Sequence, residues 1–276
     1  MTLSVNTNPG ALIALQNLNS TNRDLAETQN RINTGLKVSS ARDDGAIFAI
    51  AQNLRSDLSG IQAVKQSLDR AVSTLDVAIA AAESVSDLLV ELKSKAVAAS
   101  DSSLDTQSRI ALNNDFVALR DQITTIVANA EFNGVNALNS TAAKDITAIT
   151  SDNGTSTITV DKQVLTLSGA NVVLGTAETI STVTQAASAV TDIETSLSNV
   201  NASLAKLGTG SKSFGTQRIF ADKLSDVIET GIGNLVDADL AKESAKLNAL
   251  QVKQQLGVQA LSIANQAPSV ILSLFR

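Results

Sequence analysis

The sequence predicts a mainly α-helical fold: an elongated antiparallel helical bundle or coiled coil with a small β-hairpin insert. Apolar residues recur at intervals of three and four positions over most of the 276 residues, which places them on one face of a helix. The longest such run, from about residue 40 to residue 100, contains no Pro. Aromatic residues make up only 2% of the chain, so Ala, Leu, Val and Ile must fill the interior, as suits helices packed at close range.

The composition excludes most catalytic chemistry. The chain has no His and no Cys, so it lacks the commonest general base, the thiol nucleophile and the usual zinc ligands. We expect no cofactor and no metal, and an enzyme is the weakest interpretation. The net charge of −6 and the lack of a basic block argue against nucleic-acid binding.

Neither end of the chain has the pattern of a secretory or membrane segment. Met1–Asn22 contains no basic residue, so it lacks the charged start of a signal peptide. Gln254–Phe275 carries no charge, but its amide side chains and Pro268 interrupt it too often for a spanning helix. We expect this amphipathic segment to pack against protein, with no membrane insertion.

The first helix should begin at Asn8-Pro9 and end at Gly35. Asn caps helices well, Pro is favoured at the first helical position, and Gly adopts the left-handed conformation that closes a helix. Its two heptad columns are Ala11, Leu18, Leu25 and Ile32, and Leu15, Asn22, Gln29 and Leu36. Polar residues in a coiled-coil seam cost stability but fix register and partner number, so we interpret this helix as an arm that needs a partner.

A helix of roughly 60 residues should follow, with a length of ~90 Å at ~1.5 Å per residue. Its columns are Ile47, Leu54, Ile61, Leu68, Leu75, Ala82 and Leu89, and Ala51, Leu58, Lys65, Val72, Ile79 and Ser86. Ser102 and Asp105 have the spacing of a capping box and should begin the next helix. We expect that helix to fold back on the long one as an antiparallel hairpin.

After this helix the apolar period changes to two. Glu131–Leu138 is expected to form a turn anchored by Phe132 and Leu138. Short β-branched segments follow at residues 146–149, 155–160, 164–167 and 172–174. Asp152-Asn-Gly154 lies between the first two as a hairpin turn, so we expect a small β-hairpin region at about residues 142–175.

Helical periodicity returns at about Glu178. Its seam should consist of Val183, Val190, Leu197 and Leu204 in one column and Ala186, Ile193, Val200 and Leu207 in the other, with no polar residue in either. Gly208 and Gly210 should loosen this helix locally, and the glycines at 231 and 233 should end it. The last helix carries Val236, Leu250, Ala264 and Ile271 in one column and Leu240, Leu247 and Leu261 in the other.

Heptad helices at both ends and a hairpin in the middle imply a chain that folds back on itself. We expect residues 1–40 and 234–276 to form terminal coiled-coil core segments that pair with each other. Residues 41–233 would form a helical rod domain that includes the β-hairpin region.

Asp43 and Asp44 form the only conspicuous carboxylate pair, and Arg42 and Arg55 flank it. A catalytic or metal-binding dyad is one interpretation. We favour a structural one, with charge at a helix start and ion pairs to a neighbouring chain, because adjacent residues on a helix point in different directions.

Three segments carry a family resemblance. They are Ser40-Ala-Arg-Asp-Asp-Gly-Ala-Ile-Phe-Ala-Ile-Ala51, Glu131-Phe-Asn-Gly-Val-Asn-Ala-Leu138 and Ile263-Ala-Asn-Gln-Ala-Pro-Ser-Val-Ile-Leu272. In this order they resemble bacterial flagellin: the segment before its long helix, its Phe-Asn-Gly turn and its C-terminal ending. The resemblance covers almost the whole chain except about residues 142–175. The chain has no room for large variable outer domains, so it resembles a short flagellin.

The resemblance implies a structural subunit that polymerises into the bacterial flagellar filament for motility. Its terminal segments would pair as a coiled coil in the innermost tube and be disordered in the free monomer. The implied partners are the chain itself, alone or mixed with related flagellins, the hook-associated junction and cap proteins, and the flagellar type III export apparatus with an export chaperone. The subunit would be secreted to the extracellular filament without signal cleavage.

On this interpretation, subunits pack through the seams of the two terminal segments and through the charge cluster. The residues expected at these contacts are Leu15, Leu18, Asn22, Leu25, Gln29, Ile32, Arg42, Asp43, Asp44, Arg55, Leu247, Leu250, Gln254, Leu261, Ile271 and Leu274.

Two other interpretations stay open. A flagellar hook–filament junction protein shares the terminal heptads, although its central region is usually larger. A non-flagellar coiled-coil scaffold, such as a chemoreceptor-like cytoplasmic rod, would carry continuous heptads into a tip at the centre of the chain. The Thr-rich insert argues against that arrangement.

Overall fold

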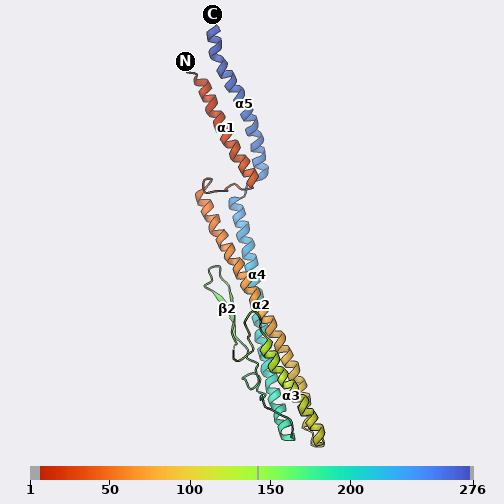
Figure 1. Cartoon of the computed structure of the whole chain (residues 1–276). Helices are drawn as coiled ribbons and strands as arrows, with labels where there is room; N and C mark the ends of the chain where they lie inside the picture. Colours follow the sequence, from red (N-terminus) through yellow and green to blue (C-terminus); the bar gives the residue numbers. More distant parts are fainter. Residues whose placement is uncertain (1–6, 142, 274–276) are drawn as a thin grey trace. The chain divides into compact units, whose positions relative to one another are not determined.

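The computed structural model describes residues 7–141 and 143–273 (Figure 1). In chain order its elements are α1 (Pro9–Thr34), α2 (Gly45–Ala99), α3 (Thr106–Asn129), β1 (Ile146–Ile149), β2 (Thr157–Val160), α4 (Val183–Val236) and α5 (Leu240–Ser273). The mainly helical fold with a small β-hairpin is thereby confirmed. The chain divides into a terminal unit of residues 1–56 with 227–276 and a central unit of residues 57–226, with the boundaries inside α2 and α4. In the described ranges, no helix combines the length and apolar character needed to cross a membrane.

α1 begins and ends where the sequence predicts. The Asn8 side-chain oxygen accepts a hydrogen bond from the Ala11 N–H at 3.1 Å, and Pro9 is the first helical residue. Gly35 has a φ of 72° and donates its N–H to the Arg31 carbonyl at 2.9 Å. A residue with a side chain is strained at this φ, so Gly closes the helix here.

α1 and α5 lie side by side in the terminal unit and run antiparallel (Figure 1). At one end the Asn8 amide donates to the Ala264 carbonyl at 2.6 Å. At the other end the Arg31 guanidinium lies 3.3 Å from Glu243 Oε1. Advancing along α1 therefore means going back along α5. We call this pair of helices the terminal hairpin.

In the central unit, α2 and α4 also run antiparallel. Three ion pairs join them: Lys65 to Asp222 at 2.7 Å, Arg218 to Asp69 at 2.6 Å and Lys93 to Glu194 at 2.8 Å. From the first pair to the last, α2 advances by 28 residues while α4 goes back by 28 residues. The two helices thus keep one constant register over this length.

α3 folds back on α2, as predicted. Lys95 on α2 lies 2.7 Å from Asp115 on α3, and Arg109 donates to the Ala99 carbonyl at 3.0 Å. The capping-box prediction was wrong, because Asp105 is itself the cap. Its carboxylate accepts the N–H groups of the second and third residues of α3 at 2.9 and 3.0 Å, and Ser102 takes no part in it.

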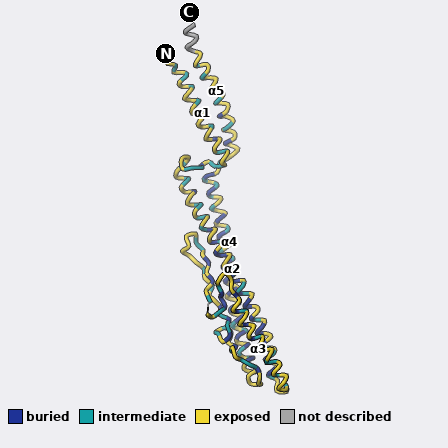
Figure 2. The backbone as a smooth tube through the Cα atoms, viewed as in Figure 1, coloured by how far each residue is buried: buried dark blue, intermediate teal, exposed yellow. Residues whose placement is uncertain are grey.

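Buried residues recur along α2 and α4 of the central unit (Figure 2). One predicted column of each helix is buried there, from Ile61 to Leu89 in α2 and from Ala186 to Leu207 in α4, whereas Ile47 and Leu54 are half-buried. Apart from Ala51, which is buried as predicted, the partner column lies one residue earlier than predicted. In α2 the partner column is Val64, Ala71, Ala78, Val85, Leu92 and Ala99. In α4 it is Ala189, Ser196, Ser203 and Gly210, so this seam is not free of polar residues. The small residues of α4 let neighbouring backbone approach closely: the Ser196 hydroxyl accepts the Val173 N–H at 2.9 Å. The larger apolar residues at the predicted positions, such as Leu197 and Leu204, are only half-buried.

α4 is one continuous helix of 54 residues, contrary to the predicted breaks at its glycines. A helical Gly costs only ~1 kcal/mol relative to Ala, which packing along a helix of this length outweighs. Gly210 is needed for another reason, since a Cβ there would lie 2.6 Å from a Val160 methyl group. The start was also predicted too early. Residues 175–182 form an irregular segment that is tied to α3, with the Ile180 N–H donated to Asn113 and the Glu178 carbonyl accepting from Arg120.

The insert contains two of the four predicted strands. β1 and β2 pair antiparallel with Ile146 opposite Val160, and Gly154 closes the predicted turn at a φ of 72°. Residues 164–167 and 172–174 are not strands. The Leu165 N–H bonds instead to the Leu138 carbonyl at 2.9 Å, and the Val173 N–H bonds to the Ser196 hydroxyl. The apolar side chains of Leu165, Leu167, Val172 and Leu174 are buried, whereas Val173 is exposed.

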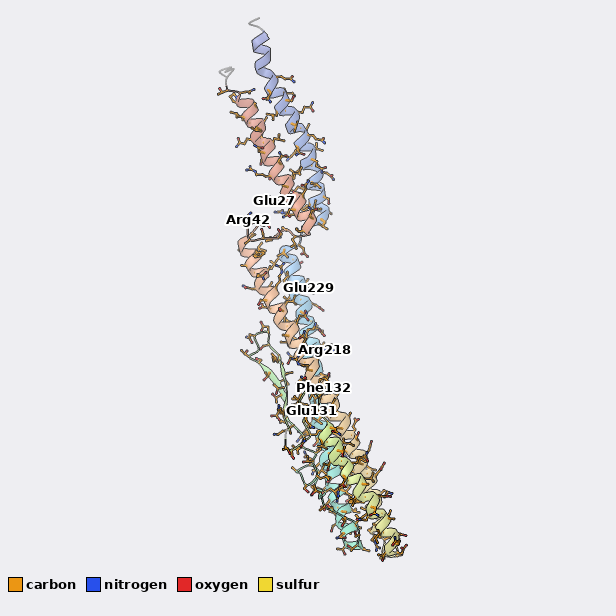
Figure 3. The ribbon with its side chains drawn as sticks, viewed as in Figure 1. Glu27, Arg42, Glu131, Phe132, Arg218 and Glu229 are labelled. Atoms are coloured by element: carbon orange, nitrogen blue, oxygen red, sulfur yellow. The ribbon has the colours of Figure 1, made fainter. Side chains whose placement is uncertain are left out.

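The Phe-Asn-Gly turn is held by a residue that the sequence reading passed over. Leu138 is buried as expected, whereas the Phe132 side chain is 37% exposed (Figure 3). The backbone of Phe132 exchanges two hydrogen bonds with Val135, both at 3.0 Å. The buried Asn136 donates to the Val127 carbonyl at 2.8 Å and accepts the N–H groups of Leu138 and Asn139 at 2.8 and 3.0 Å. One amide thus joins the end of α3 to the start of the insert.

Candidate subunit-packing surface

The terminal hairpin buries very little of itself. The seam between its helices consists of Ala11, Ala14, Leu18, Thr21, Leu25, Thr28 and Ile32 on α1 and Glu243, Leu247, Leu250, Gln254, Gly257, Leu261 and Ala264 on α5. Only Thr28, Glu243 and Leu250 of these are fully buried in the described residues. Two helices cover a single stripe of each other, so the remaining faces of both stay open.

The half of the hairpin nearest the chain ends is uncharged and combines amide with apolar side chains. α1 has no charged residue before Arg23, and α5 has none from Gln254 to Ser273. Large side chains nevertheless point outward there, with Leu12 62% and Ile263 64% exposed. Leu15, Leu256 and Val258 are exposed as well. Large apolar side chains exposed in number on an uncharged surface are typical of a protein–protein contact.

The structure separates the predicted seam residues of α1 into two groups. Leu18, Leu25 and Ile32 are half-buried toward α5, whereas Leu15, Asn22 and Gln29 are exposed. The seam positions predicted for the second group are occupied instead by Ala14, Thr21 and Thr28, each one residue earlier and smaller. Of the exposed group, only Asn22 bonds to α5, where its side-chain oxygen accepts from Gln254 at 2.7 Å.

The predicted positions on α5 lie in the hairpin seam. Leu250 is buried, and Leu247, Gln254 and Leu261 are half-buried. Leu240, predicted in the same column, is exposed. The predicted contacts of the Ile271 side chain and of Leu274 lie outside the described residues.

Sequence reasoning missed a polar cluster at the end of the hairpin farther from the chain termini. Arg31 bonds Glu27 on its own helix at 2.5 Å and Glu243 on α5 at 3.3 Å. Thr28 is fully buried in the seam. The signal in the sequence is the spacing of Thr21 and Thr28, which follow Ala14 at intervals of seven.

The carboxylates of Asp43 and Asp44 are engaged locally. Asp43 Oδ2 accepts hydrogen bonds from the hydroxyls and N–H groups of Ser39 and Ser40 at 2.9–3.2 Å, and Asp44 Oδ1 accepts the N–H groups of Ala46 and Ile47 at 3.0 Å. The Ser39 hydroxyl, followed by the backbone N–H groups, lowers the pKa of the Asp43 carboxyl. Asp44 thus caps α2, as expected of charge at a helix start.

The two arginines of this cluster are available for other contacts. Neither Arg42, in the segment before α2, nor Arg55, on α2, forms an ion pair with any described residue. The described part of the chain also holds no group of three acidic residues placed to bind a metal ion.

Comparison with known proteins agrees with this arrangement. The bacterial flagellin N-terminal helical region matches residues 5–143, and the flagellin C-terminal helical region matches residues 190–275. The chain belongs to the bacterial flagellin family. Flagellin FljM of Caulobacter vibrioides is 54% identical over 273 residues, covering 99% of this chain and 98% of the relative. The flagellin of Brucella melitensis is 37% identical over 294 residues, covering 99% of each.

Solved structures share the fold at low sequence identity. Bacillus cereus flagellin aligns with a TM-score of 0.51 and 22% identity over 56% of this chain and 87% of its own. A putative flagellar hook-associated protein from Vibrio parahaemolyticus aligns with a TM-score of 0.59 and 14% identity, over 71% of this chain and 100% of its own. Family membership makes this short flagellin a structural subunit of the flagellar filament and not an enzyme. The junction-protein and scaffold interpretations are not favoured.

Proposed function

We propose that the terminal hairpin is the element that holds subunits together in the filament. The observation that carries this proposal is its uncharged, apolar outer surface, which α1 and α5 leave uncovered. Burying apolar area is favourable by about 25 cal/mol per Å², and few charges would need to lose their water. A repeated contact between different faces of identical subunits produces a helical polymer when its rotation does not close into a ring.

Truncation tests this proposal. Purified monomer seeded with sheared filament fragments should form long filaments, and variants that lack residues 1–35 or 234–276 should form none in negative-stain images. Circular dichroism should show that the central unit of each variant keeps its cooperative unfolding. Filaments from either truncated chain would refute the proposal.

Within the charge cluster, we assign inter-subunit ion pairs to Arg42 and Arg55. Reversing the charge of Asp43 or Asp44 would also remove the local hydrogen bonds described above. Those variants could therefore fail to polymerise because of a local folding defect and do not test the interface. Arg42→Glu and Arg55→Glu disturb no described bond. Both should raise the critical concentration for polymerisation, measured by sedimentation, while monomer helicity stays unchanged. Normal polymerisation of both variants would contradict the assignment of inter-subunit ion pairs to these arginines.

We also propose that the subunit is secreted unfolded by the flagellar type III apparatus with an export chaperone. It would add between hook-associated junction and cap proteins, alone or mixed with related flagellins. The support is family membership, together with a chain that has no Cys and so forms no disulfide that would resist unfolding. The test is the location of the chain in cells with a disabled export apparatus. Accumulation inside the cell is expected, and continued release into the medium would contradict this route.

A further inference from the structure

Two segments of the central unit carry opposite charges that the described residues leave unneutralised. α2 has no basic residue between Arg70 and Lys93, and α4 has no acidic residue between Glu194 and Asp222. The acidic strip on α2 consists of exposed Asp76, Glu83, Asp87 and Glu91. The basic strip on α4 consists of exposed Lys206 and Lys212 in that segment and of exposed Lys223, which directly follows Asp222, the partner of Lys65. None of these seven side chains forms an ion pair with any residue that the structure describes.

The acidic strip is unfavourable for an isolated helix. Glu83, Asp87 and Glu91 follow one another at intervals of four residues, and like charges at this spacing destabilise a helix. Elsewhere on the same helix, Lys65, Asp69 and Lys93 all have partners on α4. The acidic strip therefore has no described cationic partner, although the neighbouring charges of α2 are paired.

Both strips also expose large apolar side chains. Val90 is 56% exposed beside the acids, and Ile219 and Phe220 are 58% and 55% exposed among the lysines. Charged residues around an apolar centre are the usual composition of a protein interface. The two strips are opposite in charge, and both combine charged with exposed apolar side chains.

We propose that the acidic strip of one copy of this chain packs against the basic strip of a second copy in the filament. This inference rests on the filament function and adds a second contact to that of the terminal hairpin. It is a contact between two different surfaces, so every added subunit presents a fresh acidic strip and a fresh basic strip, as an open helical polymer requires.

The two strips fit each other in one register. Subunits of a helical polymer share one polarity, so α2 of one copy meets α4 of the next antiparallel, as the two helices do within the chain. With Asp76 opposite Lys223, Asp87 is eleven residues forward and Lys212 is eleven residues back. The register rests on these two pairs, because Lys206 lies six residues before Lys212 and therefore about 120° round the helix from it. Ile219 falls opposite the exposed Ala80.

Charge exchange tests the register with the full-length chain. Asp87→Lys and Lys212→Glu should each raise the critical concentration for seeded polymerisation at least tenfold, measured by sedimentation. The double variant Asp87→Lys with Lys212→Glu should return to within about threefold of the unmodified chain, since it restores opposite charges across the contact. The mismatched double variant Asp87→Lys with Lys223→Glu should stay impaired. Asp76→Lys with Lys223→Glu provides a second matched pair.

The outcomes separate this contact from the filament function itself. Singles that polymerise normally, a matched double that stays impaired, or a mismatched double that recovers equally well would each overturn the proposed pairing. Failure of the unmodified chain to polymerise would instead count against the proposed role of the terminal hairpin. All substituted side chains are exposed, so monomer melting temperatures should agree within a few degrees.

Discussion

The terminal hairpin and the central unit are built from the same heptad repeat, yet they bury it to different depths. On α4 a residue is fully buried every three or four positions from Ala186 to Phe214, because α2, α3 and the insert cover its face from several sides. On α1 the only fully buried residue is Thr28, because α5 alone covers it. The same heptad pattern is therefore fully buried within the chain in the central unit but only partly buried in the terminal hairpin. The hairpin must obtain the rest of its burial from other subunits.

The largest contrast should come from truncating one buried side chain in each unit. Phe214→Ala in the central unit should lower the free energy of unfolding by about 3–5 kcal/mol, since it leaves a cavity among fully buried neighbours. Leu250→Ala in the terminal hairpin should hardly change monomer unfolding but should weaken polymerisation. Denaturant unfolding and sedimentation measure the two effects. Equal losses of monomer stability would mean that the hairpin is folded without its neighbours.

Asn136 sharpens the comparison, because its buried side-chain amide joins the end of α3 to the start of the insert in the central unit. Asn136→Ala should cost about 1–3 kcal/mol, as it leaves buried backbone groups at the end of α3 and at Leu138 unpaired. The matched control is Asn139→Ala, which removes one exposed contact to the Thr141 N–H and should have little effect. Thermal unfolding of both variants would show the difference, and equal melting temperatures would contradict this role.

Two glycines of α4 should respond in opposite directions. A Cβ on Gly208 meets open space, so Gly208→Ala should stabilise the central unit by up to ~1 kcal/mol through helix propensity. A Cβ on Gly210 would lie within 3 Å of two Val160 methyl groups, so Gly210→Ala should shift β2 and destabilise the unit. Shifts of the same sign in thermal unfolding would show that α4 does not hold the insert at this point.

The smallest expected effect concerns pH. Burial raises the pKa of Glu178. The Gly175 N–H, which donates to the Glu178 carboxylate at 2.7 Å, lowers this pKa, and the nearby Asp192 carboxyl raises it. A pKa that is higher in the folded state gives stability that is full in acid and is lost as the pH rises through the folded value. Glu178→Gln should therefore raise the melting temperature at pH 7 and lose that advantage below the ordinary Glu range. A gain in melting temperature that is equally large at pH 7 and in acid would contradict this effect of burial.

Large apolar residues made most of the fold predictable from sequence. The helix-rich fold, the start and end of α1 and the antiparallel return of α3 all follow from spacing and capping residues. Most of the seam errors share one cause: at Gln29 in α1, Ile79 in α2 and Leu197 in α4, a larger residue one place later was preferred to the true seam residue. Thr28, Ala78 and Ser196 are buried because they are small enough to admit a neighbour. That neighbour comes from distant sequence, so the local pattern could not reveal it.

The candidate surface was predictable only in outline. Uncharged amphipathic ends indicated a packing role, but whether Leu15 or Leu18 faces α5 depends on which side the partner helix lies. Asp44 lies at a helix start as expected, whereas the hydrogen bonds of Asp43 to Ser39 and Ser40 became visible only in the folded segment. Contacts between copies stay predictions, because a single chain contains only one side of each.

Hydrogen exchange of monomer and filament, followed by mass spectrometry, tests most directly whether the terminal hairpin folds only on assembly. In the monomer, amides of α1 and α5 should exchange nearly as fast as in an unfolded chain, while those of the central unit stay protected. In the filament both should be protected. Strong protection of α1 and α5 in the monomer, equal to that of the central unit, would contradict the account.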